Sequence, residues 1–131
     1  MHQFPVRVYY EDTDLGGIVY YANYLKFIER GRSEWLRDLG IDQRALKDEQ
    51  GLIFVVRRVE GDYLRPAHFD DQLTVVTRVD EIAGASLSLD QKVLRGDQVL
   101  FAGKVVLVCL NAQGRASRLP EALRAKLALR G

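Results

Sequence analysis

The sequence has few of the residues on which many activities depend. It contains one cysteine, Cys109, and two histidines, His2 and His68, among 131 residues. A single cysteine excludes an internal disulfide and a multi-cysteine zinc site, and its apolar surroundings are typical of a small buried residue. Two histidines far apart in the chain argue against a transition-metal site. We therefore expect no metal and no cofactor.

Charge of one sign and long apolar runs are also lacking. Nineteen basic residues oppose eighteen acidic ones, for a net charge of +1, so the basic stripe of a nucleic-acid-binding protein is missing. No run approaches the roughly 20 apolar residues that span a bilayer. Pro5, Arg7 and Glu11 come too early for a signal peptide. We expect a soluble, cytoplasmic protein without nucleic-acid partners or membrane spans.

The hydrophobic pattern predicts an α+β domain over residues 1–131, a length that normally forms one core. Residues 4–10 alternate like a strand, and residues 20–39 have the period of a long helix. A short helix is expected at 42–50 and another after Pro120. Four more strands are expected, at 52–64, 73–79, 87–93 and 99–110. One long apolar helix needs a sheet to pack against, which favours two layers.

Two details predict how these elements pack. The apolar stripe of the long helix consists of Tyr24, Phe27, Ile28, Gly31, Trp35 and Leu39. Glycine inside a helix costs about 1 kcal/mol relative to alanine, so we expect another part of the chain to pass close to Gly31. Residues 99–110 are apolar on both faces apart from Lys104, which predicts a central strand buried on both sides.

Three carboxylates precede a glycine pair and the expected start of the long helix. They are Glu11, Asp12 and Asp14, and the pair is Gly16 and Gly17. Glycines let backbone N–H groups approach a ligand, and a helix N-terminus favours negative charge. An acid beside such donors suits acyl transfer, which needs a base or nucleophile and an oxyanion site. An ordinary acidic turn that caps a helix has the same composition, so these residues alone leave both interpretations open.

The segment as a whole resembles the active-site segment of the hotdog-fold acyl-CoA thioesterases. The likeness is to the 4-hydroxybenzoyl-CoA thioesterase-like group and its Tol–Pal-associated branch. The family pattern begins with an aromatic strand, here residues 8–10, followed by Glu-Asp-Thr-Asp at 11–14 and a glycine pair at 16–17. It continues with a hydrophobic-aromatic run at 18–21 and ends with Phe-x-Glu-Arg at 27–30. The match is dense through residue 39 and looser to about residue 110. It implies a curved antiparallel five-stranded sheet wrapped around one long central helix.

The resemblance also implies roles for individual residues. Asp14 is the implied catalytic residue, which either attacks the thioester carbonyl or activates a water. The backbone N–H of Tyr21 is the implied oxyanion donor, reinforced by the turn at Gly16 and Gly17. Several Tol–Pal-branch relatives carry histidine at the position of Tyr21, whereas tyrosine occurs in the 4-hydroxybenzoyl-CoA type. Ser86 lies where relatives contact the nucleotide arm of coenzyme A.

The implied function is hydrolysis of short- to medium-chain or aromatic acyl-CoA thioesters by a homo-oligomer, a tetramer built as a dimer of dimers. Basic side chains should surround the coenzyme A phosphates, and the candidates are Arg57, Arg58, Lys92, Arg95 and Lys104. One alternative is an interaction protein that binds acyl carrier protein or lipid-synthesis enzymes and has little activity. Another is a hotdog dehydratase or hydratase, which is disfavoured because such sites pair an acid with a histidine and His68 is the one internal histidine.

Overall fold

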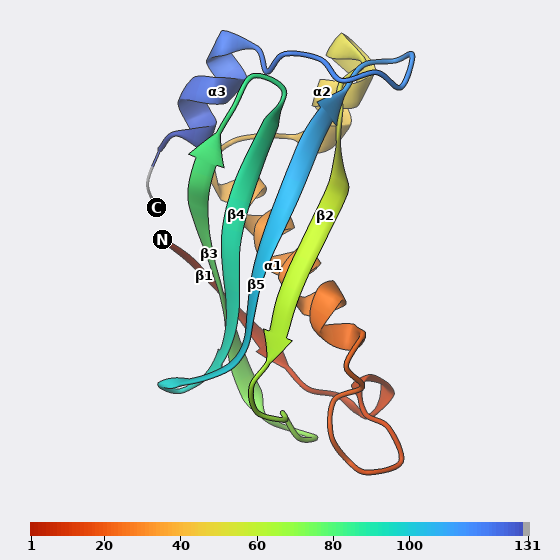
Figure 1. The fold of residues 1–131 in the computed structure, drawn as a ribbon, viewed down its shortest axis with the longest axis vertical. Helices are drawn as coiled ribbons and strands as arrows, with labels where there is room; N and C mark the ends of the chain where they lie inside the picture. The colour runs from red at the N-terminus through yellow and green to blue at the C-terminus, as the bar shows by residue number, and fades with distance from the viewer. Residues whose placement is uncertain (130–131) are drawn as a thin grey trace.

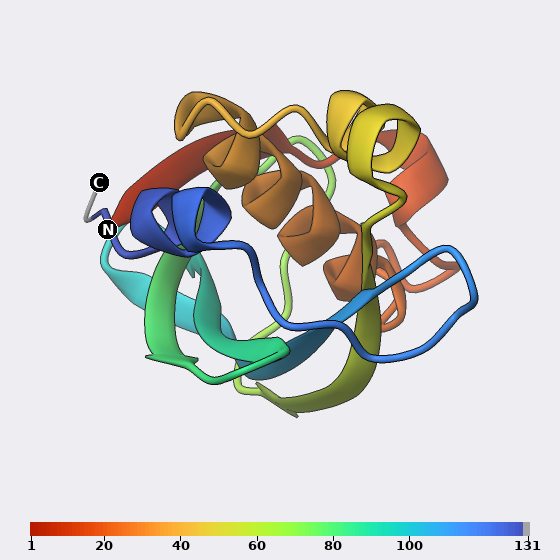
Figure 2. The same cartoon turned by 90° about the horizontal axis from the view of Figure 1, so that it is seen from above.

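The strands form one curved antiparallel sheet around a long helix. The computed structural model describes residues 1–129. Its strands are β1 (His2–Arg7), β2 (Ile53–Tyr63), β3 (Gln72–Ile82), β4 (Ser86–Arg95) and β5 (Gln98–Leu110). They lie in the order β1-β3-β4-β5-β2, and every neighbouring pair is antiparallel. Helix α1 (Asn23–Asp38) lies inside the curve of the sheet (Figures 1 and 2). The predicted α+β architecture is confirmed.

Three short helical segments complete the fold: η1 (Tyr10–Asp12), α2 (Gln43–Gln50) and α3 (Glu121–Leu127). The side chain of Asp42 accepts two backbone N–H groups at the start of α2, and Gly51 ends it in the left-handed conformation, which confirms the predicted short helix. Helix α3 follows Pro120 and lies at the end of the sheet where β3 and β4 join (Figure 1). No helix within residues 1–129 is long and apolar enough to cross a membrane.

The buried face of α1 is the predicted stripe with one exchange. Its buried residues are Tyr24, Phe27, Ile28, Gly31, Trp35 and Leu36, whereas Leu39 is only partly buried. A Cβ atom at Gly31 would lie only 3.0 Å from the Cβ of Val75 on β3. The glycine is therefore required by a β3 side chain that packs directly on the helix backbone.

The predicted end of the first strand was wrong. Residues 4–10 have the alternation of a strand, but β1 ends at Arg7. The carboxylate of Asp12 is buried, and its Oδ2 accepts the backbone N–H of Tyr9 at 2.8 Å. This hydrogen bond closes the η1 turn, so side-chain capping overrides the strand preference of the aromatic residues.

The long helix starts later than the predicted position near Tyr20. The N–H of Asn23 donates to the carbonyl of Tyr20 at 2.8 Å, and the N–H of Tyr24 donates to that of Tyr21 at 3.3 Å. These are tight-turn bonds between residues three apart, so regular α-helix begins at Asn23. The segment before α1 is thus a loop with exposed backbone.

Strand β5 lies in the interior of the sheet as predicted, between β4 and β2. The prediction that both its faces are buried was wrong for the middle of the strand. Lys104 is exposed there, and Ala102 and Val106 are half-buried. The reason is that α1 covers one face of the sheet, whereas no helix of the described chain lies over the middle of the other face (Figure 1).

Candidate functional site

Asp14 lies exposed in the loop between η1 and α1, held by its own turn. Its Oδ1 accepts the N–H of Gly16 at 2.9 Å, and its backbone carbonyl accepts the N–H of Gly17 at 3.0 Å. A Cβ at Gly16 would make a tight contact of 3.3 Å with Oδ1, and Gly17 has a φ of +79°, a conformation that favours glycine. Within residues 1–129, Oδ2 accepts no hydrogen bond. The turn therefore presents one carboxylate oxygen to a ligand.

The backbone N–H of Tyr21 is a free donor just before α1. The N–H of the preceding residue, Tyr20, is used, since it donates to the carbonyl of Asp12 at 2.9 Å. The N–H of Tyr21 donates to no acceptor in the described part of the chain. Free N–H groups at a helix N-terminus stabilise negative charge. A free acid oxygen and a free donor therefore lie on one short segment, residues 14–21.

Aromatic rings connect this segment to the core. The ring of Tyr21 packs edge-on against Tyr63 at the end of β2, with centroids 5.9 Å apart. Tyr63 contacts Phe101 of β5 at 5.0 Å, and Phe101 stacks on Tyr24 of α1 at 5.5 Å. Tyr24 and Phe101 are buried, whereas Tyr21 and Tyr63 are 61% and 48% exposed. The rings form an apolar wall that reaches the surface beside the free N–H.

Two glycines make room for the ring of Phe101 in this aromatic wall. Gly61 on β2 and Gly103 on β5 are paired across the sheet, and the ring of Phe101 lies over both. A Cβ at Gly61 would be 2.5 Å from Phe101 Cζ, and one at Gly103 would be 2.8 Å from Cε2. The ring position therefore depends on glycine at both sites.

The loop between β2 and β3 fastens the site from the other side. The carbonyl of Ala67 accepts the N–H of Val19 at 2.8 Å, and the N–H of Ala67 donates to the hydroxyl of Tyr24 at 3.0 Å. No role in the site was predicted for residues 65–71 or for Tyr63. The sequence gives no signal for either contact, because both partners are distant along the chain.

Most of the predicted phosphate-binding residues are already engaged. Arg95 bonds to Asp71, while Arg58 and Lys104 pair with Glu60 and Asp80. The remaining two candidates, Arg57 and Lys92, form no ion pair within the described residues.

Ser86 lies far from Asp14 within one chain. It begins β4, and the other end of that strand, Arg95, contacts the loop beside the Asp14 turn. The strand has 10 residues, so its ends are about 30 Å apart. The structure brings Asp14, Gly16, Gly17 and Tyr21 together but not Ser86.

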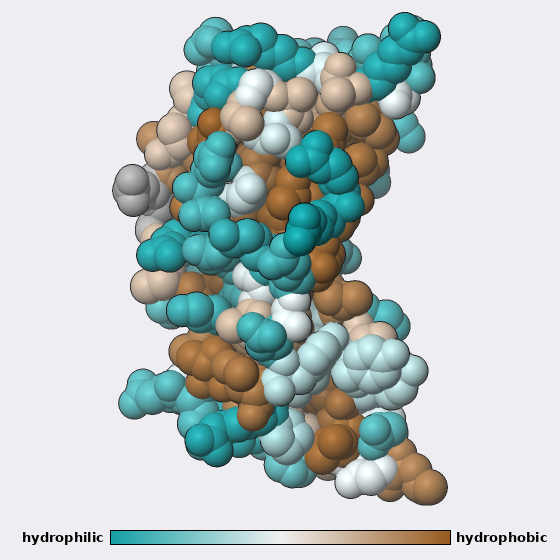
Figure 3. Space-filling model, in the orientation of Figure 1, coloured by the Kyte–Doolittle hydropathy of each residue, from teal (hydrophilic) through white to brown (hydrophobic). Residues whose placement is uncertain are grey.

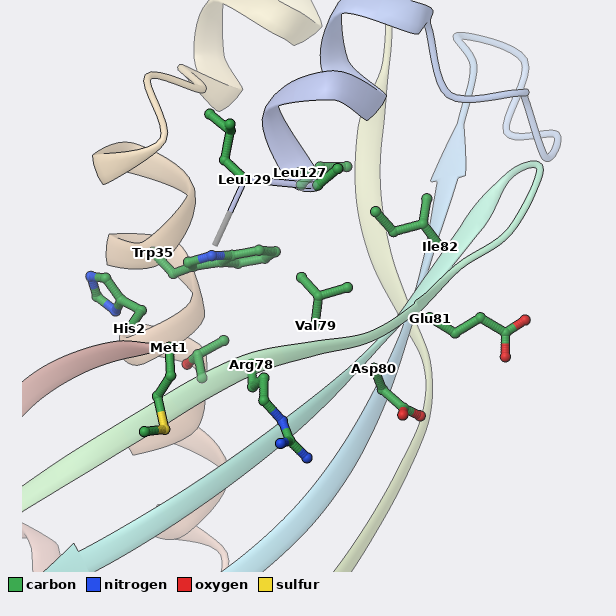
Figure 4. A pocket seen from close by; sticks show the side chains of 12 residues that line it. Met1, His2, Trp35, Arg78, Val79, Asp80, Glu81, Ile82, Leu127 and Leu129 are labelled. Atoms are coloured by element: carbon green, nitrogen blue, oxygen red, sulfur yellow. The ribbon is translucent and has the colours of Figure 1, made fainter. Parts of the chain in front are cut away.

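A cavity of about 450 Å³ lies elsewhere, between β1, β3, α1 and α3 (Figure 4). Its lining includes His2, Trp35, Val79 and Leu127 and none of the predicted site residues. The Nε2 of His2 is engaged with Asp38 Oδ2 at 2.7 Å. Residues 1–129 contain no group of three or more His, Cys, Asp or Glu arranged to hold a metal ion. The candidate site is therefore the segment around Asp14.

A curved five-stranded antiparallel sheet around one long helix defines a hotdog-fold domain. The chain belongs to the thioesterase-like superfamily, whose family model matches residues 8–127. It is 47% identical over 108 residues to the acyl-CoA thioesterase YbgC of Haemophilus influenzae, covering 82% of this chain and 79% of that protein. It is 27% identical over 125 residues to the 1,4-dihydroxy-2-naphthoyl-CoA hydrolase of Synechococcus elongatus, covering 94% and 92%.

Solved structures agree with this assignment. A probable thioesterase from Bartonella henselae superposes with a TM-score of 0.87 at 43% identity, over 91% of this chain and 98% of that one. The family resemblance that the sequence indicated is confirmed.

Proposed function

We propose that this protein hydrolyses acyl-CoA thioesters, with Asp14 as the catalytic carboxylate and the Tyr21 N–H as the oxyanion donor. The observation that carries the proposal is the segment 14–21, which holds a free carboxylate oxygen and a free backbone donor in one loop. The similarity to YbgC of Haemophilus influenzae supports a coenzyme A thioester as the substrate.

In this mechanism the thioester carbonyl oxygen accepts the N–H of Tyr21. One such donor is typically worth about 2.7–4 kcal/mol in the transition state. Asp14 then acts by one of two routes. Either its carboxylate attacks the carbonyl carbon and water hydrolyses the resulting anhydride, or it takes a proton from a water that attacks directly. In both routes the C–S bond breaks, coenzyme A leaves as a thiolate that is then protonated, and one water is consumed.

A carboxylate is sufficient for this chemistry because a thiolate, with a pKa of about 8.5, leaves readily. The two routes differ in one observable. Mass spectrometry of intact protein, quenched during turnover, detects the added acyl mass in the anhydride route and none in the general-base route.

The acyl group in this proposal lies against the exposed rings of Tyr21 and Tyr63. This surface suits short- to medium-chain or aromatic acyl groups, and one relative is by name the hydrolase of an aromatic acyl-CoA, 1,4-dihydroxy-2-naphthoyl-CoA. Arg57 and Lys92 are the first candidates for the phosphates of coenzyme A, since the structure leaves them free of ion pairs within residues 1–129.

We also propose that the protein works as a homo-oligomer, a tetramer built from two dimers. Strand β2 supports this because it is an 11-residue strand at one edge of the sheet. Its exposed apolar side chains include Ile53, Val56 and Val59, and hydrophobic surface follows that side of the molecule (Figure 3). A long edge strand of this kind pairs readily with a second chain. Pairing along β2 would place the partner subunit beside Tyr63. Ser86 of the partner subunit would then face the site of this chain.

The test is thiol release from a panel of acyl-CoAs by wild type and Asp14→Asn, with light scattering on the same samples. Turnover that disappears in the variant supports a carboxylate-dependent thioesterase. Absence of turnover on every acyl-CoA and on acyl carrier protein conjugates would overturn it. In that case, capture of acyl carrier protein would favour an interaction protein, and hydration of crotonyl-CoA would favour a hydratase. A monomer that turns over at full rate would overturn the oligomer proposal.

A further inference from the structure

An ion pair between Arg95 and Asp71 helps to anchor the loop that fastens the site, together with the Arg7–Asp70 ion pair and the backbone hydrogen bonds of residues 70 and 71 with Val8. Arg95 at the end of β4 donates from Nη1 to Asp71 Oδ2 at 2.8 Å and to the carbonyl of Pro66 at 3.2 Å. Its Nη2 donates to Gln98 Oε1 at 2.9 Å. Asp71 Oδ2 also accepts the backbone N–H of His68 at 2.8 Å. The side chains of Arg95 and Asp71 are 31% and 24% exposed, so solvent screens this pair less than the other ion pairs of the sheet.

The anchored loop reaches Asp14 in two hydrogen bonds. Ala67, which follows Pro66, accepts the N–H of Val19 through its carbonyl at 2.8 Å. The carbonyl of Ile18 then accepts the backbone N–H of Asp14 at 3.0 Å. The position of the Asp14 turn relative to the sheet therefore depends on the position of Ala67.

The same residue also sets the start of α1. The N–H of Ala67 donates to the hydroxyl of Tyr24, and the N–H of Tyr24 donates to the carbonyl of Tyr21 at 3.3 Å. Ala67 is fully buried and Tyr24 is nearly so, so the hydrogen bond between them is shielded from water. One backbone position thus links the acid to the oxyanion donor.

We propose that Arg95 and Asp71 are positioning residues for thioester hydrolysis, which hold loop 66–71 so that Ala67 keeps Asp14 and the Tyr21 N–H in register. The inference rests on the proposed function of that site. It also gives Arg95 a different role from binding the phosphates of coenzyme A, because its guanidinium is engaged inside the protein.

The test compares Arg95→Gln with a matched control, Arg78→Gln. Arg78 donates to Asp90 at 3.1 Å and joins β3 to β4 away from the loop, so the control removes an interstrand ion pair without loosening Ala67. We expect kcat to fall about 10- to 100-fold in Arg95→Gln, the scale of a misplacement of about 1 Å. We expect the KM of Arg95→Gln to change little, and Asp71→Asn to show the same fall in kcat. Arg95→Lys should recover part of the lost kcat. Arg78→Gln should keep the wild-type kcat.

A second readout does not depend on activity. Amide hydrogen exchange of the peptide covering residues 14–24 should be faster in Arg95→Gln than in wild type, and unchanged in Arg78→Gln. Wild type that turns over no acyl-CoA would overturn the proposed function, whereas the exchange rates would still decide whether the pair holds the loop. Unchanged exchange in Arg95→Gln, or a rise in KM with kcat intact, would overturn the positioning role. The rise in KM would return Arg95 to the phosphate-binding candidates.

Discussion

The buried hydroxyl of Tyr24 accepts a hydrogen bond from the backbone N–H of Ala67, with 3.0 Å between Oη and N. Burial raises the pKa of Tyr24, and this effect outweighs the opposing effect of the Ala67 N–H. The hydroxyl is therefore neutral at physiological pH and acts as an acceptor for a backbone group that water cannot reach. Five consequences of this and the surrounding contacts can be measured.

Replacing Tyr24 by phenylalanine removes the acceptor and leaves a buried N–H without a partner. We expect a loss of about 1–3 kcal/mol in the free energy of unfolding, measured by urea denaturation. Tyr21→Phe is the matched control, because its ring is exposed and it removes the same hydroxyl, with an expected change within about 0.5 kcal/mol. Equal losses in the two variants would contradict the importance of the Tyr24–Ala67 hydrogen bond.

Asp14→Asn should separate catalysis from folding. An asparagine Oδ1 can still accept the N–H of Gly16, so the turn and the melting temperature should be kept. Removal of the carboxylate should lower kcat by about 10²–10⁴-fold, measured by thiol release. Glu11→Gln removes an exposed charge from the same loop and should retain activity. A similar loss in both variants would indicate that the charge of the loop matters and the position of the acid does not.

Tyr21→Ala tests whether the backbone or the ring of this residue contributes more. The variant keeps the N–H but loses the edge-on contact with Tyr63, so we expect a decrease in kcat/KM of about tenfold at most. The decrease should be smaller than that of Asp14→Asn in the same assay. A folded Tyr21→Ala protein as inactive as Asp14→Asn would show that the backbone N–H is insufficient as the oxyanion donor.

Gly61→Ala should destabilise the protein by displacing the ring of Phe101 in the aromatic wall. Its new methyl group would lie 2.5 Å from Phe101 Cζ, so the ring must shift and its packing on Tyr24 and Tyr63 must change. Overpacking of this kind costs about 1–3 kcal/mol in the free energy of unfolding. Gly84→Ala is the control, since its Cβ would meet only Arg118 at 3.7 Å, an ordinary contact. The prediction fails if thermal melting ranks the two variants in the opposite order.

Stability in acid should depend on Asp71. Partial burial alone would raise its pKa, but the N–H of His68 and the guanidinium of Arg95 together hold it below the ordinary value of 3.8. A depressed pKa stabilises the folded state above the unfolded value, and the contribution is lost as pH falls through the lower folded pKa. His68 Nδ1 lies 3.8 Å from Asp71 Oδ2 and is a further, smaller cause that lowers the pKa of Asp71.

The measurement is the free energy of unfolding of wild type and Asp71→Asn across the acid range. The wild type should be the more stable of the two at neutral pH, and the difference should shrink below about pH 4. A constant difference across the range would mean that the charge of Asp71 does not contribute.

The sequence predicts what is local in this fold. The 3.6-residue period identifies α1, and Asp42 and Gly51 bracket α2, because a helix is determined by side chains close along the chain. The proposed acid, the glycine pair and the proposed oxyanion donor also lie on one continuous segment, so a family resemblance could point to all of them, and their roles stay predictions.

Contacts between distant segments had no such signal. Nothing near Arg95 distinguishes a residue that anchors a loop from one that binds phosphate, and both its role and that of Ala67 depend on strand order. The position of Ser86 also could not be predicted from nearby residues, since its distance from Asp14 is set by the direction of β4. Local competition explains the errors at the strand end, where the buried carboxylate of Asp12 captures the backbone of Tyr9.

The strand order has a consequence for how the site is made during synthesis. Within residues 1–129 of one chain, strand β2 pairs with β5 alone, from Ile53 opposite Leu110 to Tyr63 opposite Phe101. When a ribosome has released the Asp14 loop, α1 and β2, that partner does not yet exist, and such long-range pairing is slow to form. The nascent chain therefore carries an unpaired strand with both edges open until β5 emerges, and this interval is when aggregation competes with folding. Catalytic competence should be among the last properties the chain acquires.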